Sequence, residues 1–221
     1  IKENLDRITR EIPIDVTLVA VSKTKPIGDL LEAYNCGHRI FGENKIQELV
    51  LKSQELPADI EWHMIGHLQT NKVKYIAPFI QLIHAVDSLK LLKEINKQAR
   101  KNKRTIDCLL QFHIASEESK FGMDFNAVKD LLSSEEFIEM QNVSVVGLMG
   151  MATCTDNEDQ IREEFRNLEG YFQIVKSHFF KFNDAFKHIS MGMSGDYKIA
   201  IEEGSTMVRI GSSIFGSRKP V

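Results

Sequence analysis

The sequence predicts a single α/β domain, residues 1–221, folded as a TIM-type (β/α)₈ barrel with an extra N-terminal helix. Two observations predict this fold. Eight apolar segments are separated by amphipathic ones, and most of the apolar segments are continuous runs, which indicates parallel strands buried on both faces. Eight such units close without leaving sheet edges. An open doubly wound sheet is the alternative, but no GxGxxG motif follows the first strand.

Each predicted strand is a short apolar run that ends at glycine or polar residues, as "VTLVAVSKTKP" shows at residues 16–26. Runs of Val, Ile and Leu suit a sheet that is covered on both faces. The predicted strands are, in order, residues 16–21, 39–44, 60–66, 82–87, 105–114, 143–152, 188–194 and 207–216.

The predicted helices place apolar residues at helical spacing among charged ones. Residues 1–12 form such a segment ahead of the first strand, outside the eightfold count. Gly37 is a stop signal for the helix after the first strand. The helices between strands are residues 27–37, 45–56, 71–79, 88–103, 125–137, 157–180 and 196–204.

The composition excludes several functional classes. The chain is 43% hydrophobic and 27% charged with a net charge of −3, so it lacks the basic footprint of a nucleic-acid-binding protein. No apolar run has the length of a membrane span, and the first residues contain no signal-peptide core. Cys36, Cys108 and Cys154 are odd in number and widely spaced, which argues against a disulfide framework or a zinc site and favours the cytoplasm.

Polar residues gather where the predicted strands end, the end at which barrels of this kind carry their active sites. Lys23 follows the first strand, although a lysine at the end of a buried strand is unfavourable unless it reaches water or becomes neutral and reactive. The loops after the last two strands, "MGMSGD" and "RIGSSIFG", are rich in the glycine and serine that bind phosphate. Each feature alone is an ordinary turn or a solvated lysine. Together they favour a phosphorylated aldehyde, such as pyridoxal 5′-phosphate (PLP), condensed with the lysine.

Longer stretches carry a resemblance to a known family. These are "VAVSKTKP", "FGENKIQE", "WHMIGHLQTNKVKYI", "HAVDS", "SKFGM", "VVGLMGMA" and the run from "SMGMSGDY" to "VRIGSSIFG". In this order, from about Val16 to Gly216, they resemble the YggS/PROSC family of pyridoxal phosphate homeostasis proteins. That family is similar in fold to the N-terminal barrel of bacterial alanine racemase.

The resemblance implies a PLP site with Lys23 as the Schiff-base lysine, that is, a covalent aldimine on this residue. It places Arg209 near the pyridine nitrogen and Met149 near the ring, although Met149 is about as well explained as core filling. The remaining cofactor-binding residues are two that lie close to the coenzyme, Asn44 and His67, and three that bind its phosphate, Ser194, Gly211 and Ser212.

The resemblance implies a role in intracellular PLP homeostasis, and the residues favour a carrier over an enzyme. An arginine at the ring nitrogen disfavours a protonated pyridinium, which weakens the ring as an electron sink. A racemase also needs two opposed bases, and alanine racemase takes the second, a tyrosine, from a C-terminal domain for which this sequence leaves no room. Tyr197 is the tyrosine placed nearest the site. We therefore expect PLP and PLP-dependent apo-enzymes as partners, no nucleic acid or membrane, and a monomer.

Three alternatives stay open from the sequence. The first is a PLP-dependent amino-acid racemase. The second is an aldolase in which Lys23 attacks a sugar-phosphate ketone directly, and trapping with borohydride in the absence of PLP would reveal it. The third is a metal-dependent barrel hydrolase that uses histidines around the third to fifth strands, His63, His67, His84 and His113.

Overall fold

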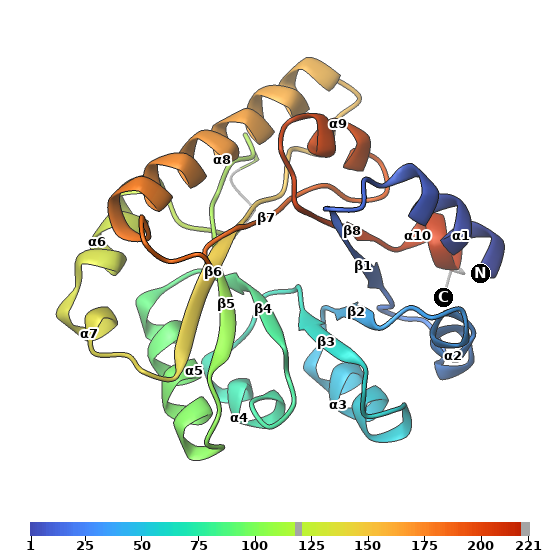
Figure 1. Ribbon diagram of the computed structural model, residues 1–221, viewed down its shortest axis with the longest axis horizontal. Helices are drawn as coiled ribbons and strands as arrows, with labels where there is room; N and C mark the ends of the chain where they lie inside the picture. The colour runs from blue at the N-terminus through green and yellow to red at the C-terminus, as the bar shows by residue number, and fades with distance from the viewer. Residues whose placement is uncertain (118–120, 218–221) are drawn as a thin grey trace.

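The computed structural model describes residues 1–117 and 121–217. Residues 118–120 and 218–221, which include the first two residues of the SKFGM motif, lie outside the described residues. The described strands form a closed barrel in which each strand is parallel to the next and the last pairs with the first, which confirms the predicted barrel (Figure 1). They are β1 (Thr17–Val21), β2 (Ile40–Glu43), β3 (Glu61–Met64), β4 (Leu82–Val86), β5 (Ile106–Gln111), β6 (Val143–Met149), β7 (His188–Ser190) and β8 (Met207–Ile210).

Helices surround the barrel on its outside (Figure 1). They are α1 (Lys2–Glu11), α2 (Ile27–Asn35), α3 (Ile46–Glu55), α4 (Val73–Ile76) after the 3₁₀ turn η1 (Thr70–Lys72), α5 (Leu89–Lys101), α6 (Phe125–Ser133), α7 (Glu135–Ile138), α8 (Glu158–Phe179), α9 (Tyr197–Glu202) and α10 (Ser212–Phe215). Ser88 begins α5 by accepting a hydrogen bond from the Leu91 N–H at 3.3 Å, as its position before the apolar pattern predicts.

Several predicted segments differ from the structure. The fifth and sixth strands end at Gln111 and Met149 rather than at residues 114 and 152, and the predicted helix 71–79 is η1 followed by the shorter α4. The seventh strand ends at Ser190 rather than at residue 194, because Gly192 has a φ of +96° that turns the chain out of the sheet. The eighth strand ends at Ile210, and the rest of its predicted range forms the short helix α10. The predicted helix 125–137 is two helices, because Ser134 is extended and caps the second one.

Two apolar clusters stabilise the fold. The larger one fills the space between the strands and the outer helices, and it includes Leu5 and Ile8 of α1. The smaller one lies inside the barrel and consists of Val19, Leu82, Ala85, Leu109, Val146, Met149 and Met207. Helix α1 lies beside α10, where the Asn4 amide donates to the Ile214 carbonyl at 3.1 Å (Figure 1). Within the described part of the chain, no helix combines the length and the apolar character needed to cross a membrane.

Candidate functional site

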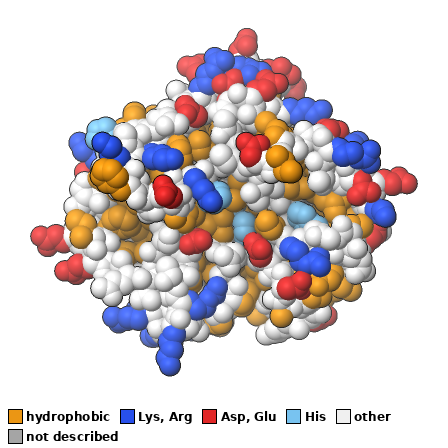
Figure 2. Space-filling view, viewed as in Figure 1, with side chains coloured by type: hydrophobic (Ala, Val, Ile, Leu, Met, Phe, Trp, Pro, Cys, Tyr) orange, Lys and Arg blue, Asp and Glu red, His pale blue; other side chains and the backbone are white. Residues whose placement is uncertain are grey.

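A cleft of about 390 Å³ opens at the carboxyl ends of the strands. All of the predicted site residues except Met149 line it, namely Lys23, Asn44, His67, Ser194, Arg209, Gly211 and Ser212. They come from the turns after β1, β2, β3, β7 and β8 and from β8 itself. The space-filling view shows histidine and hydrophobic side chains near the centre of one face, with charged side chains around them (Figure 2).

Two lysines on the turn after β1 line the cleft. Lys23 is half-buried. The ammonium of Lys25 donates to the carbonyls of Phe215 and Gly216, each at 2.9 Å, and to that of Ser217 at 3.3 Å. A lysine that binds the last carbonyls of a helix in this way stabilises the helix end. Lys25 is thus tied to α10.

Arg209 begins a chain of buried hydrogen bonds through the barrel interior. Its guanidinium donates to the Ser190 hydroxyl at 2.6 Å and to the Gly150 carbonyl at 3.1 Å. The Ser190 oxygen lies 2.9 Å from Nδ1 of His84, whose Nε2 lies 3.0 Å from Nδ1 of His63. Because a guanidinium only donates, the Ser190 oxygen accepts from Arg209, whereas the directions of the bonds from Ser190 to His84 and from His84 to His63 depend on the imidazole tautomers.

Burial determines the protonation states of the side chains in this hydrogen-bond chain. It lowers the pKa of His63 to about 3 and that of His84 well below the usual 6.5, and the proximity of the His63 ring and the positive charge of Arg209 disfavour protonation of His84 further. Burial also lowers the pKa of Arg209 to about 10, which leaves the guanidinium protonated at neutral pH. One permanent cation therefore lies beside two neutral imidazoles beneath the cleft.

The loops after β7 and β8 meet at the cleft through Ser194 and Gly211. The Gly211 N–H donates to the Ser194 hydroxyl oxygen at 3.2 Å, so the hydroxyl hydrogen stays available to donate elsewhere. No heavy atom beyond its chain neighbours lies within 4 Å of a Cβ built on Gly195. These donors beside open space fit a phosphate group.

Asn44 contributes an unsatisfied polar atom on another side of the cleft. Its Oδ1 is buried without a hydrogen-bond partner in the described part of the chain. The backbone of Gly66 packs so closely on Asn44 that a Cβ at Gly66 would lie 2.6 Å from the Asn44 carbonyl oxygen, which only glycine tolerates. An orphaned acceptor of this kind fits a ligand that carries a hydrogen-bond donor.

His67 lies at the mouth of the cleft. Its ring stacks on Phe121 with ring centroids 4.3 Å apart, and its Nδ1 lies 3.1 Å from an Asp87 carboxylate oxygen. The His67 side chain is 40% exposed. At this position the His67 ring can contact a planar ligand at the entrance of the cleft rather than a ligand bound deeper in the cleft.

One predicted site residue lies outside the cleft, and several residues that were not predicted line it. Met149 is buried in the cluster inside the barrel, which agrees with its alternative role as core filling, whereas Met151 lines the cleft. The cleft is also lined by Lys25, Ile65, Gln111 and Phe121, to which the sequence assigned no role in the site, and by Met193 and Gly195 of the predicted phosphate loop. Gln111 was missed because the predicted fifth strand continued to residue 114. The structure ends β5 at Gln111, whose amide donates to the Phe121 carbonyl at 3.1 Å.

Two other expectations are settled by side-chain contacts. Tyr197 is nearest the site in sequence, but its hydroxyl binds Glu11 of α1 and it does not line the cleft. His63 and His84 bond each other within the barrel, as their mid-strand positions predict. No group of three or more His, Cys, Asp or Glu residues placed to hold a metal ion occurs in residues 1–117 and 121–217.

Comparisons with known proteins agree with this geometry. The family model described as "Alanine racemase, N-terminal domain" matches residues 1–219. A curated protein of Aquifex aeolicus (strain VF5), named pyridoxal phosphate homeostasis protein, is 42% identical over 203 residues, which cover 91% of this chain and 87% of that protein.

Solved structures show the same relationship. PipY of Synechococcus elongatus PCC7942 has a TM-score of 0.91 at 31% identity without PLP, over 98% of this chain and all of PipY. With PLP bound the TM-score is 0.88 at 30% identity, over 97% of this chain and 99% of PipY. Alanine racemase of Clostridium difficile 630, at 13% identity and a TM-score of 0.73 over 98% of this chain and 56% of the racemase, shares the fold alone. The chain therefore belongs to the alanine racemase N-terminal-domain family and, within it, to the YggS/PROSC family of pyridoxal phosphate homeostasis proteins.

Proposed function

We propose that this chain binds PLP reversibly in the cleft and acts in intracellular PLP homeostasis as a carrier. The observation that carries the proposal is the cleft itself, which brings Lys23, the Ser194–Gly211 loops and the buried Arg209 together. Two comparisons support it, since PipY has a structure with PLP bound and the Aquifex relative is named for PLP homeostasis.

Each end of such a ligand has suitable partners in the cleft. When bound, PLP supplies an aldehyde carbon that a neutral lysine amine attacks reversibly with release of one water. We assign that amine to Lys23, which follows β1 and lines the cleft, whereas the ammonium of Lys25 holds the end of α10 through three carbonyls. The Ser194 hydroxyl and the Ser212 N–H would donate to the phosphate beside Gly211, whose own N–H orients the Ser194 hydroxyl, and Arg209 would face the ring nitrogen.

The charges in the cleft favour holding the coenzyme over using it. The protonated Arg209 guanidinium can only donate a hydrogen bond, so it favours an unprotonated ring nitrogen and a weak electron sink. Racemisation also needs a second base on the opposite face. Within the described part of the chain no tyrosine lines the cleft, and Tyr197 is bound to Glu11. A carrier uses the same binding contacts without this second base.

The test separates transfer from catalysis. Protein loaded with PLP should reactivate a PLP-dependent apo-enzyme, while the α-proton of L- or D-alanine should not exchange with deuterated solvent. Exchange that is fast in wild type and lost in Lys23→Ala would show a racemase-type site and contradict the carrier proposal. Sedimentation of the loaded protein alone tests the expected monomer, and sedimentation with the apo-enzyme tests for direct contact.

Arg209→Gln should weaken retention of PLP. The change removes a charged donor, and a charge-assisted hydrogen bond contributes about 1.5–3 kcal/mol. Titration followed by absorbance should therefore show a dissociation constant about ten- to a hundredfold higher, with covalent attachment still reached at high PLP. Arg162→Gln is the control, because Arg162 pairs with Glu202 and Glu203 away from the cleft. Equal affinity of both variants would show that Arg209 does not contact the coenzyme.

Pyridoxal, which lacks the phosphate, should bind much more weakly than PLP, and inorganic phosphate should compete with PLP. Ser194→Asp places a negative charge among the phosphate donors and should reproduce the loss. Ser177→Asp, an exposed position on α8, is the matched control. Calorimetric titration with both compounds measures the effect, and equal affinity for pyridoxal and PLP would remove the phosphate site.

A further inference from the structure

The residue that follows Lys23 has an unusual backbone. Thr24 has a φ of +63°, and Lys103 is the other non-glycine with positive φ among the described residues. The left-handed region is unfavourable for a β-branched residue, because its side chain crowds the backbone. A conformation of this kind persists only where neighbouring groups hold it.

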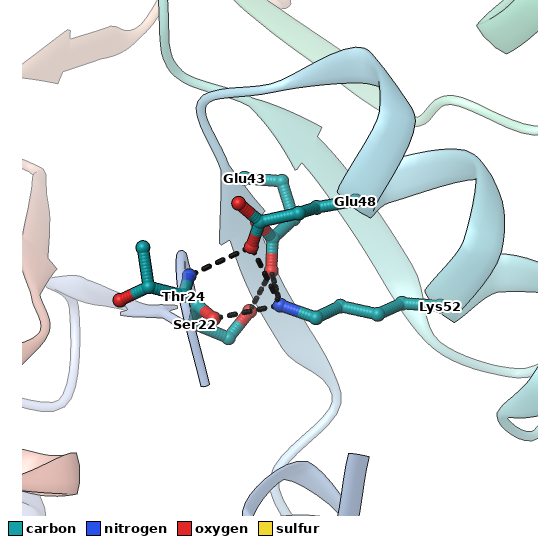
Figure 3. A network of polar contacts seen from close by, with 5 residues as sticks. All are labelled: Ser22, Thr24, Glu43, Glu48 and Lys52. Carbon is teal, nitrogen blue, oxygen red and sulfur yellow. Dashed lines mark hydrogen bonds and ion pairs between the residues drawn. The ribbon is translucent and has the colours of Figure 1, made fainter. Parts of the chain in front are cut away.

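Side chains from β2 and α3 hold this turn on both sides of Lys23 (Figure 3). After Lys23, the Thr24 N–H donates to a Glu48 carboxylate oxygen at 2.7 Å. Before it, the Lys52 ammonium donates to the Ser22 carbonyl at 2.8 Å, and the Ser22 hydroxyl donates to Glu43 at 2.6 Å. The peptide groups that flank Lys23 are therefore both anchored to the same cluster.

One ammonium joins the two carboxylates of this cluster. Lys52 lies 2.7 Å from a Glu43 oxygen and 3.2 Å from a Glu48 oxygen. The exposed fractions of the side chains are 5% for Lys52, 0% for Glu43 and 26% for Glu48. Burial raises the pKa of Glu43, although Lys52 and Ser22 lower it in part. Its Oε2 is buried without a hydrogen-bond partner in the described residues.

The desolvation of buried charges offsets much of the stability that such a cluster contributes to a fold. Two carboxylates and one ammonium lose hydration on burial, and apolar residues of similar size often stabilise as well. None of Glu43, Glu48 and Lys52 lines the cleft, so direct ligand contact does not account for them. What the cluster does contact is the backbone of the turn that carries Lys23.

We propose that Glu48, Lys52 and Glu43 are positioning residues for Lys23, which hold the left-handed turn so that its amine is presented to the aldehyde in the cleft. This inference rests on the proposed function, because it assigns these residues to the covalent step. Glu48 restrains the residue after Lys23, and Lys52 restrains the one before it. Glu43 holds Lys52 and the Ser22 hydroxyl in place.

Glu48→Ala tests the proposal most directly, since it removes the acceptor of Thr24 and leaves Lys52 paired with Glu43. Covalent attachment of PLP, trapped by borohydride and quantified by mass spectrometry, should slow about tenfold or more because the amine is misplaced. Affinity for pyridoxine 5′-phosphate, whose alcohol cannot react with the lysine, should stay unchanged. In protein without coenzyme, the Thr24 amide should exchange hydrogen with solvent faster.

A rescue distinguishes positioning from general stabilisation. Thr24→Gly adopts a positive φ without strain, so adding it to Glu48→Ala should restore most of the attachment rate. Glu55→Ala, an exposed carboxylate on the same helix, should change none of these measurements. Lys52→Met combined with Glu43→Gln removes both buried opposite charges together, and it should slow attachment as Glu48→Ala does.

The outcomes separate the two proposals. If Glu48→Ala keeps the wild-type attachment rate, or loses it without rescue by Thr24→Gly, the positioning role is wrong. If wild-type protein itself attaches no PLP, the proposed function fails. The Thr24 exchange rate still decides whether Glu48 holds the turn, and an unchanged rate overturns the inference.

Discussion

Lys23→Ala should abolish covalent attachment of PLP while the protein stays folded. Wild-type protein incubated with PLP should turn yellow, and borohydride should fix the coenzyme to the peptide that contains Lys23. The variant should show neither effect, because its cleft keeps the phosphate donors but lacks the amine. The fold should persist because Lys23 is half-buried at a cleft and is not part of the apolar core. Thermal unfolding followed by circular dichroism checks this.

Lys25→Ala is the matched control, two residues further along the same turn. It removes the contacts to the end of α10 and should lower stability slightly, but the adduct should still form on Lys23. An adduct mapped to Lys25 or Lys72 in the wild-type protein would contradict the assignment of Lys23.

Acid should lower the free energy of unfolding substantially, because His63 and His84 are buried in the neutral form. Both are neutral in the folded barrel, with the pKa of His63 near 3 and that of His84 well below 6.5, whereas both take up protons in the unfolded chain below about pH 6.5. The unfolded state then binds more protons, so the free energy of unfolding falls as the pH falls. The expected slope is up to about 1.4 kcal/mol per pH unit for each histidine.

Other groups also titrate in acid, so the measurement is a difference between variants. Urea unfolding of wild type and of His84→Asn between pH 7 and 4.5 should show a shallower dependence of the free energy of unfolding on pH in the variant, and His63→Asn/His84→Asn should be shallower still. The slope that remains includes His38 and His188, whose pKa burial also lowers. Above about pH 7.5, where the unfolded histidines are also neutral, the histidine contribution should be flat. His178→Asn, at an exposed position on α8, is the control. If the double variant keeps the wild-type slope, the pair is not held neutral in the barrel.

The sequence by itself determined the order of elements and the end of the barrel at which the site lies. Apolar runs and Gly37 are local signals, and parallel strands that close in sequence order leave all their carboxyl ends on one side. Lys23 and the loops around Ser194 and Gly211 are therefore predicted to share one site from the sequence alone, and all of them line one cleft in the structure.

Only the tertiary structure decided which side chains reach that cleft and which are paired beneath it. Met149 and Met151 look alike in sequence, but Met149 is the last residue of β6 and is buried inside the barrel, whereas Met151 lies two residues beyond the strand end and lines the cleft. The same holds for pairings between distant segments. His84 meets Ser190 across 106 positions, Tyr197 meets Glu11 across 186, and Lys52 meets Ser22 across 30. Local propensity determines helices and strands, whereas the partner of a buried polar group is determined by how the closed barrel brings remote segments together.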